Sequence, residues 1–415
     1  MKKTMAEINE KISSGKVVVV TADEMSEIVA EEGPERAAEK VDVVTSATFG
    51  PMCSSGALLN VGHPEPRIKI ERAYLDGVPA GCGLAAVDVY LGASALPDQD
   101  PRNRPHPGRF ETGGGHVIER LVRGHDVVFE AFGYGTDCYP RTHLKTLLNI
   151  KDLNSAVLIN PRNCYQNYAV AVNADPRRTI YTYMGILRPN FGNANYATCG
   201  RLSPLFNDPL LETIGIGTRV LVAGSPGYVF FRGTQHQDVE RTERELPRAP
   251  AATLALVADM KKMDANFLRG VSLIGYGVSL AVGVAIPIPV LDDRTAWMCG
   301  VRDEDIVMPV VDYSGDYPQR TGKTLGEVTF AQLRSGAIRI GERLVETAST
   351  SSYRKALEQA DLLAERIRKG AFLLSAPVER LPLSGEEAVF RGLSVREVPL
   401  SEGFRGRGAA VEGRE

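Results

Sequence analysis

The longest uncharged stretch restricts the fold of this chain more than any other feature. It is Val271–Leu291, "VSLIGYGVSLAVGVAIPIPVL", and it is long enough to cross a bilayer as a helix. Glycines and prolines recur through it, however, and a proline inside a helix removes a hydrogen bond and clashes with the preceding turn. We therefore expect buried strands joined by a glycine turn rather than a membrane span.

Alternating helix and strand signals near the N-terminus predict a mixed α/β fold. Thr4 and Thr21 are each followed three residues later by a glutamate, which is the pattern of a capping box at the start of a helix. Strands are expected at 17–20 and 41–48, where β-branched residues gather. From about residue 60 to 315, short apolar runs between Gly, Pro, Asn and Asp predict a glycine-rich region of strands and turns.

Three further helices are predicted, at 116–124, 252–263 and 351–370. In the last, apolar residues recur at three- and four-residue spacing, as on the buried face of an amphipathic helix. No break in composition divides the chain, so we expect one large catalytic domain over 1–383. A polar C-terminal tail is expected over 384–415.

Composition and charge exclude several classes of protein. The chain has 415 residues, 43% hydrophobic and 24% charged, which is ordinary for a globular protein. A net charge of −3 gives no basic surface for nucleic acid. The N-terminus has lysines but no apolar run behind them, so we expect no signal peptide, no membrane association and a cytoplasmic location.

The spacing of the six cysteines excludes the common metal-binding motifs. They are Cys53, Cys82, Cys138, Cys164, Cys199 and Cys299. None lies within four residues of another, so there is no CxxC and no zinc or iron–sulfur spacing. We predict no metal site and a reducing environment.

The first candidate site is "TSATFGPMCSSG", residues 45–56. A predicted strand ends, a Gly-Pro pair turns the chain, and Cys53 follows with Ser54 and Ser55. A thiol at a helix N-terminus is shifted toward thiolate, and the two hydroxyls there would bind an anion. The alternative is a small buried side chain at a turn.

The second candidate is "FGYGTDCYPRTH", residues 132–143. Cys138 follows a bent, glycine-containing segment and precedes Arg141 and His143. Cations lower the pKa of a thiol, whereas Asp137 would oppose them if it pointed inward. The alternative is a turn whose cysteine only packs.

The third candidate is "ETGGGHVIERLVRG", residues 111–124. Glycines precede a helix with His116 in its first turn, so the N–H groups of Gly114 and Gly115 are expected to cradle an anion. The segment lacks the pattern of a P-loop or a dinucleotide fingerprint, so no nucleotide is inferred. A plain tight turn is the alternative.

Two segments rich in Asn, Arg and Tyr, 160–168 and 189–201, would bind a polar small molecule or form ordinary turns. The first contains Arg162. His236 stands alone in a polar loop, where a structural role is the usual one. Two thiols in such loops, without metal spacing, indicate sulfur chemistry, either attack on an aldehyde or transfer of a persulfide sulfur.

Taken together, the motifs resemble the homocysteine biosynthesis family, long known as a domain of unknown function, which includes the L-aspartate semialdehyde sulfurtransferases of methanogens. The resemblance runs from about residue 5 to 380. It rests on "VTSATFGPMCSSGALLNVGH", "GLAAVDVYLGAS", "GGGHVIERLV", "GYGTDCYPR", "NPRNCYQNYAVAVN", "GTRVLVAGSPGYV", "GTQH" and "GVAIPIPVL".

This resemblance implies an enzyme that puts sulfur into L-aspartate semialdehyde to form L-homocysteine. The family's two functional cysteines fall on Cys53 and Cys138, while Cys82 receives no role. The resemblance also implies a partner protein with a ferredoxin domain, so that an iron–sulfur group there supplies electrons and no cofactor is bound directly. Many archaeal members add CBS domains, which we do not expect here.

Together these points predict that Cys53 and Cys138 face each other in one pocket. One of them attacks the aldehyde or carries a persulfide. Aldehyde plus sulfide lies two electrons above homocysteine, so a partner, or a disulfide closing between the two thiols, must supply the electrons. The substrate carboxylate is expected to bind the loop 113–115 together with His116, or Arg141 or Arg162.

Two other functions fit the same residues. One is a non-catalytic, metabolite-binding scaffold for a ferredoxin-like partner, and the other is a thiol acyltransferase. Sulfide or a protein-bound sulfane sulfur is the expected sulfur source, and a homo-oligomer is the expected assembly.

Overall fold

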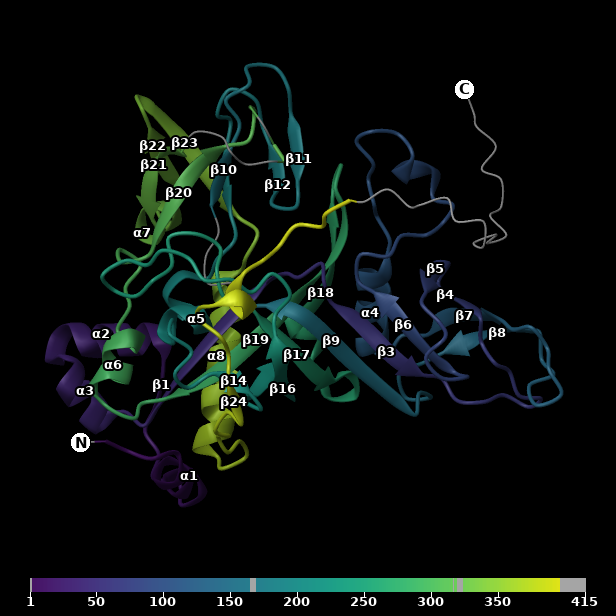
Figure 1. Cartoon of the computed structure of the whole chain (residues 1–415), viewed down its shortest axis with the longest axis horizontal. Coiled ribbons are helices and arrows are strands. Elements are labelled where there is room, and N and C mark those ends of the chain that lie inside the picture. The colour runs from purple at the N-terminus through teal and green to yellow at the C-terminus, as the bar shows by residue number, and fades with distance from the viewer. Residues whose placement is uncertain (1, 165–168, 316, 319–323, 396–415) are drawn as a thin grey trace.

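A computed structural model describes residues 2–164, 169–315, 317–318 and 324–395, and its fold is mixed α/β as predicted (Figure 1). The helices are α1 (Met5–Ser13), α2 (Ala22–Glu32), α3 (Pro34–Lys40), α4 (Gly114–Val122), α5 (Pro204–Asn207), α6 (Asp293–Cys299), α7 (Phe330–Arg334) and α8 (Tyr353–Arg368). Part of the predicted tail, 396–415, lies outside the described residues.

Both predicted capping boxes are present. The N–H of Glu7 donates to the Thr4 hydroxyl at 3.2 Å, and the Glu7 carboxylate accepts from the Thr4 N–H at 2.7 Å. At α2, the Glu24 carboxylate accepts from the N–H of Thr21 at 2.8 Å. These bonds satisfy N–H groups that have no partner inside the helix, so the local sequence determines where each helix begins.

A ten-stranded sheet forms the centre of the molecule (Figure 1). In spatial order its strands are β1 (Val19–Thr21), β2 (Val43–Pro51), β19 (Gly277–Pro289), β15 (Arg219–Val222), β16 (Ser225–Arg232), β17 (Leu254–Asp259), β9 (Ser155–Asn163), β3 (Gly56–Asn60) and β6 (Asp88–Gly92), and β18 (Leu268–Leu273) pairs with β19.

The long uncharged stretch forms strands joined by a glycine turn, as predicted, but of the two strands only β19 is buried throughout. It supplies the end of β18 and all of β19, and every residue of β19 is buried. Alternating residues of β19 face different helices. Gly283 lies against Gln359 of α8, whereas Val278 lies against Gly113 at the start of α4. Both faces of this strand are therefore covered, which explains its lack of charge.

The helix predicted at 252–263 is wrong. Its residues form β17, followed by a short 3₁₀ helix, and β17 pairs with β16 on one side and with β9 on the other. Because most of its residues are buried, the strand has no polar alternation to reveal it, and its Ala and Leu residues favour a helix locally. The helices predicted at 116–124 and 351–370 are confirmed as α4 and α8.

Two smaller sheets flank the central one (Figure 1). The upper sheet consists of β21 (Thr324–Thr329), β20 (Val307–Asp312), β10 (Val170–Val172), β13 (Ala194–Tyr196), β23 (Arg343–Ser349) and β22 (Ala337–Ile340), with the separate hairpin β11 (Ile180–Thr182) and β12 (Gly185–Leu187) beside it. The other sheet consists of β5 (Val78–Ala80), β4 (Arg72–Leu75), β7 (Val127–Phe132) and β8 (His143–Leu148). A two-stranded pair joins β14 (Gly215–Ile216) to β24 (Glu379–Arg380).

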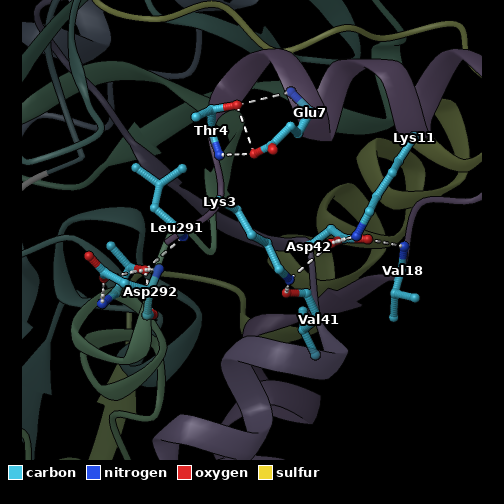
Figure 2. Close-up of polar contacts among 10 residues, drawn as sticks. Lys3, Thr4, Glu7, Lys11, Val18, Val41, Asp42, Leu291 and Asp292 are labelled. Carbon is cyan, nitrogen blue, oxygen red and sulfur yellow. Dashed lines mark hydrogen bonds and ion pairs between the residues drawn. The ribbon is translucent and has the colours of Figure 1, made fainter. Parts of the chain in front are cut away.

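A buried carboxylate fastens the N-terminal segment to the central sheet (Figure 2). Asp42, just before β2, accepts from the ammonium groups of Lys3 at 2.9 Å and Lys11 at 2.6 Å, and from the N–H of Val18 at 3.0 Å. Burial opposes ionisation of Asp42, but the hydrogen bonds outweigh burial and lower its pKa below the usual value. None of the described helices is both long and apolar enough to cross a membrane.

Candidate functional site

Two adjoining cavities meet at Cys53. Their volumes are about 560 and 460 Å³, and both are lined by Cys53, Ser54, Arg162 and Tyr276. The larger cavity extends toward the hairpin β11–β12, where Tyr183 forms part of its wall. A concave site with a thiol, a guanidinium and a phenol in its wall is suited to a small polar ligand.

Cys53 occupies the turn between β2 and β3. The N–H of Met52 donates to the carbonyl of Leu280 on β19 at 2.8 Å, and the N–H of Ser55 donates back to the Met52 carbonyl at 3.1 Å. These bonds hold the turn against the central sheet and leave the thiol partly exposed to the cavities.

The predicted local structure around Cys53 is wrong. Gly50 and Pro51 do not turn the chain, because both belong to β2, and the residues after the turn begin β3 rather than a helix. Cys53 therefore does not lie at a helix N-terminus. Pairing of β2 with β19 and of β3 with β9 determines this arrangement, and neither partner is near in sequence.

The two serines after Cys53 differ in position. Ser54 lines both cavities, and its hydroxyl donates to the carbonyl of Arg162 at 3.3 Å. Ser55 is 1% exposed and is not among the described lining residues. Within the part of the chain that the structure describes, its buried hydroxyl has no hydrogen-bond partner.

Arg162 lies near the end of β9 and lines both cavities. Of the sequence-predicted residues for binding the substrate carboxylate, Arg162 is the cationic side chain that lines the cavities with Cys53. Its segment, 160–168, is described only up to Cys164, since 165–168 lie outside the described residues.

Tyr276 is the cavity residue that sequence reasoning missed. It lies in the turn between β18 and β19, and its ring centroid is 6.3 Å from that of Tyr183. Burial and the neighbouring Cys53 thiol raise the pKa of Tyr276 to about 12, partly opposed by Arg162. The signal in the sequence was a tyrosine between two glycines, "GYG", which is equally typical of an ordinary turn.

The loop after β16 brings two glutamines to the larger cavity, Gln235 and Gln237. His236 between them is 5% exposed, accepts at Nδ1 from the N–H of Thr253 at 3.2 Å and donates from Nε2 to the carbonyl of Pro382 at 2.7 Å. This histidine is structural, as predicted, and it fixes the loop that presents the glutamines.

The glycine-rich start of α4 is not an anion cradle. The N–H of Gly114 donates to the carbonyl of Ala95 and that of Gly115 to the carbonyl of Ala93, each at 2.8 Å. A Cβ at these glycines would lie 1.8 Å from the oxygen of Gly92 and 2.2 Å from that of Ser279. The glycines are required by close packing of α4 on the sheet, and their donors are already used.

His116 lies against β18. It is packed against Gly270 of β18, and its Nε2 lies 3.3 Å from the hydroxyl of Ser272. Burial lowers the pKa of this imidazole. It is not among the described residues that line the two cavities, so a role in holding the substrate there is not supported.

Cys138 lies elsewhere, exposed on the loop between β7 and β8. The adjacent Tyr139 stacks on His63, with ring centroids 5.6 Å apart, and His63 follows the end of β3. Cys53 instead precedes the start of β3, so the two thiols lie toward opposite ends of this strand. Cys138 is not among the described residues that line the two cavities at Cys53, so our expectation of a single pocket with both thiols is not supported.

The cations near Cys138 have other partners. The guanidinium of Arg141 donates to the carbonyls of Pro66 at 3.0 Å and Glu65 at 2.6 Å. His143 pairs with Glu130 at 3.0 Å. Arg141 therefore fastens two loops together and lies outside the cavities at Cys53.

The other four cysteines are not suited to thiolate chemistry. Cys164, Cys199 and Cys299 are buried, and burial raises the pKa of each thiol. Cys82 is partly exposed, and burial raises its pKa as well. Cys53 and Cys138 thus remain the candidates that the sequence indicated.

Comparison with known proteins identifies the family. Residues 17–374 match the model of the family described as "homocysteine biosynthesis enzyme, sulfur-incorporation". The chain is 46% identical to an L-aspartate semialdehyde sulfurtransferase of Methanosarcina acetivorans over 400 residues, covering 96% of this chain and 76% of the relative. It is also 46% identical to the enzyme of that name from Methanocaldococcus jannaschii over 392 residues, covering 91% and 73%.

A more distant relative, an uncharacterized protein of Methanothermobacter thermautotrophicus, is 29% identical over 345 residues, covering 81% of this chain and 72% of the relative. No solved structure matches the chain. The family match covers most of the chain, and the two archaeal enzymes align with nearly all of it. The chain therefore belongs to the homocysteine biosynthesis family of sulfur-incorporating enzymes.

Proposed function

We propose that this chain is an L-aspartate semialdehyde sulfurtransferase that forms L-homocysteine, with Cys53 presenting sulfur to the aldehyde. The two archaeal relatives that bear this name support the activity. The observation that carries the assignment of Cys53 is its place in a wall shared by two cavities, beside Arg162 and Tyr276.

The cavity suits an amino acid that ends in an aldehyde. The guanidinium of Arg162 presents paired N–H donors that match a carboxylate, which would orient the substrate with its aldehyde toward Cys53. Gln235 and Gln237 add amide groups to the wall of the larger cavity. A thiolate or persulfide at Cys53 then attacks the aldehyde carbon, which is the usual way a cysteine activates a carbonyl.

The overall reaction needs a reductant. One aldehyde, one hydrogen sulfide, two electrons and two protons give one thiol and one water. A persulfide delivers sulfur two electrons more oxidised than sulfide, so that route needs two further electrons. We propose that a partner protein with a ferredoxin domain supplies these electrons, because the sequence holds no motif for a redox cofactor of its own.

We propose a different place for Cys138 in this scheme. Its exposed thiol on the β7–β8 loop suits exchange of sulfur or electrons with that partner protein. A disulfide between Cys53 and Cys138 is not part of the proposal, since Cys138 is not among the described residues that line the cavities at Cys53.

Reconstitution tests the proposed function. The purified chain is incubated with L-aspartate semialdehyde, sulfide and a chemical reductant, with and without a ferredoxin-domain protein, and homocysteine is quantified. We expect homocysteine from the wild-type chain, with faster formation when the partner is present. A wild-type chain that forms no homocysteine under any of these conditions would refute the activity and favour a non-catalytic scaffold.

A further inference from the structure

Tyr276 and Cys53 come from turns far apart in the sequence, yet they share both cavities. Their common place in the walls of both cavities makes them neighbours, and the Cys53 thiol contributes to the raised pKa of the Tyr276 phenol. The tyrosine is 44% exposed, so a small molecule bound at Cys53 can reach its hydroxyl. A group covalently attached to the sulfur of Cys53 therefore lies in a cavity whose wall includes the Tyr276 phenol.

The turn that carries Tyr276 is fixed from several sides. The N–H of Tyr276 donates to the carbonyl of Leu273 at 3.0 Å, and the N–H of Gly275 donates to the carbonyl of Gly108 at 2.8 Å. A Cβ at Gly275 would lie 2.5 Å from the ring of Tyr181. The backbone that carries Tyr276 is thus held in place before a substrate arrives, which favours effective proton donation from a fixed position.

We propose that Tyr276 is the general acid that protonates the aldehyde oxygen of the substrate while the sulfur carried by Cys53 adds to its carbon. This inference rests on the proposed function and assigns a catalytic residue within the same site. It accounts for a tyrosine placed at the only thiol that, among the described cysteines, lines either cavity.

The step is balanced in atoms and charge. The sulfur anion at Cys53 forms a carbon–sulfur bond with the aldehyde carbon, and the carbonyl π pair moves onto oxygen. The phenol proton of Tyr276 transfers to that oxygen, which becomes the hydroxyl of the adduct. The tyrosinate regains a proton from water. No oxidation or reduction occurs in this step, so it needs no electron source.

Of Arg162, Ser54 and Tyr276, which line both cavities, Tyr276 is the suitable proton donor. The Arg162 guanidinium does not release its proton in proteins, and the hydroxyl of Ser54 already donates to a backbone carbonyl. Burial and the nearby Cys53 thiol raise the pKa of Tyr276, with Tyr317 adding to the rise and Arg162 opposing it. The phenol therefore stays protonated at neutral pH, as an acid must before it reacts.

The test compares Tyr276→Phe with Tyr228→Phe, a matched change at an exposed tyrosine on β16. Loss of general-acid catalysis should lower the rate of homocysteine formation by roughly 10²- to 10⁴-fold in Tyr276→Phe and leave Tyr228→Phe near wild type. Cys53 must still react with iodoacetamide in Tyr276→Phe, and the thermal transition must be unchanged, which shows that the site remains folded.

A second variant separates proton donation from a structural role. Replacing Tyr276 by a fluorinated tyrosine keeps the hydroxyl and the ring but makes the phenol more acidic. We expect the alkaline limb of the pH–rate profile to move to lower pH in this variant. The role of Tyr276 would be overturned if Tyr276→Phe were as active as the wild type, or if the alkaline limb did not move. Either result would leave the proposed function intact. An inactive wild-type chain would overturn the proposed function as well.

Discussion

The side chains of Cys53 and Tyr276 meet at the wall between the two cavities, one from the β2–β3 turn and the other from the β18–β19 turn. Both turns are anchored on β19, since Met52 donates to Leu280 and Tyr276 directly precedes the strand. The uncharged strand at the centre of the fold therefore positions both reactive groups. The long uncharged stretch of the sequence thus supports the two turns that carry the candidate nucleophile and the candidate proton donor.

Gly275→Ala should impair catalysis by displacing the β18–β19 turn that carries Tyr276. The glycine has φ +71°, and a Cβ would strike the ring of Tyr181, so the turn must shift and carry Tyr276 with it. We expect at least a tenfold loss of homocysteine formation, while Cys53 remains reactive to iodoacetamide, for the reason that general-acid geometry tolerates little displacement.

The matched control for this variant is Gly341→Ala, at φ +58° with open space around the added Cβ. It introduces similar backbone strain far from the cavities. Comparable losses of activity in the two variants would show that strain alone, and not displacement of Tyr276, explains the effect.

The six cysteines should differ in reactivity toward a small alkylating agent in the native protein. Cys138 is exposed and should react without substrate protection, whereas Cys53 should react and be protected by L-aspartate semialdehyde. Cys164, Cys199 and Cys299 should stay unmodified, because burial covers them and raises the pKa of each thiol. Mass spectrometry of peptides after timed labelling measures this order, and protection of Cys138 but not Cys53 by the aldehyde would contradict it.

Asp42→Asn should destabilise the fold. The change leaves the ammonium groups of Lys3 and Lys11 without the buried carboxylate that they share (Figure 2). We expect a loss of about 2 kcal/mol in the free energy of unfolding, less than for a fully buried pair because the side chain of Lys11 is 43% exposed. The exposed pair Lys40–Glu32 provides the control, and Glu32→Gln should cost less than about 1 kcal/mol.

The contribution of Asp42 should also depend on pH. Its pKa in the folded state is lowered from 3.8, so its stabilisation is complete above that pH and is lost as the pH falls through the folded-state pKa. The difference in stability between wild type and Asp42→Asn should therefore be constant near neutrality and shrink in acid. Denaturant unfolding at several pH values measures it, and a difference that grows in acid would refute this account.

Local signals predicted the start of this fold well. Thr4 with Glu7, and Thr21 with Glu24, form the helix caps that their spacing indicated, because capping depends on residues within one turn. The strand β17 was missed, because its identity depends on pairing with β16 and β9, which are distant in sequence. Helix propensity within 252–263 carries no information on that pairing.

Only part of the site was predictable, because the local sequence indicates reactive side chains but not which distant segments lie beside them. Residue type and context singled out Cys53 and Arg162, which the structure places in one wall. The glycines at the start of α4 led to a wrong prediction, because close packing and anion binding both favour glycine there. Only the tertiary structure shows that the N–H groups of Gly114 and Gly115 donate to backbone carbonyls. Tyr276 was missed, since its nearness to Cys53 depends on the pairing of β2 with β19.

The central claim is that Cys53 presents sulfur to the aldehyde. The most direct measurement is site-resolved mass spectrometry of the chain loaded with a sulfane-sulfur donor and then mixed with L-aspartate semialdehyde, alongside homocysteine formation by Cys53→Ala and the control Cys82→Ala. The account predicts one extra sulfur on Cys53 that disappears when the aldehyde and reductant are added, no homocysteine from Cys53→Ala, and near-normal activity in Cys82→Ala. Wild-type rates of homocysteine formation in folded Cys53→Ala would contradict it.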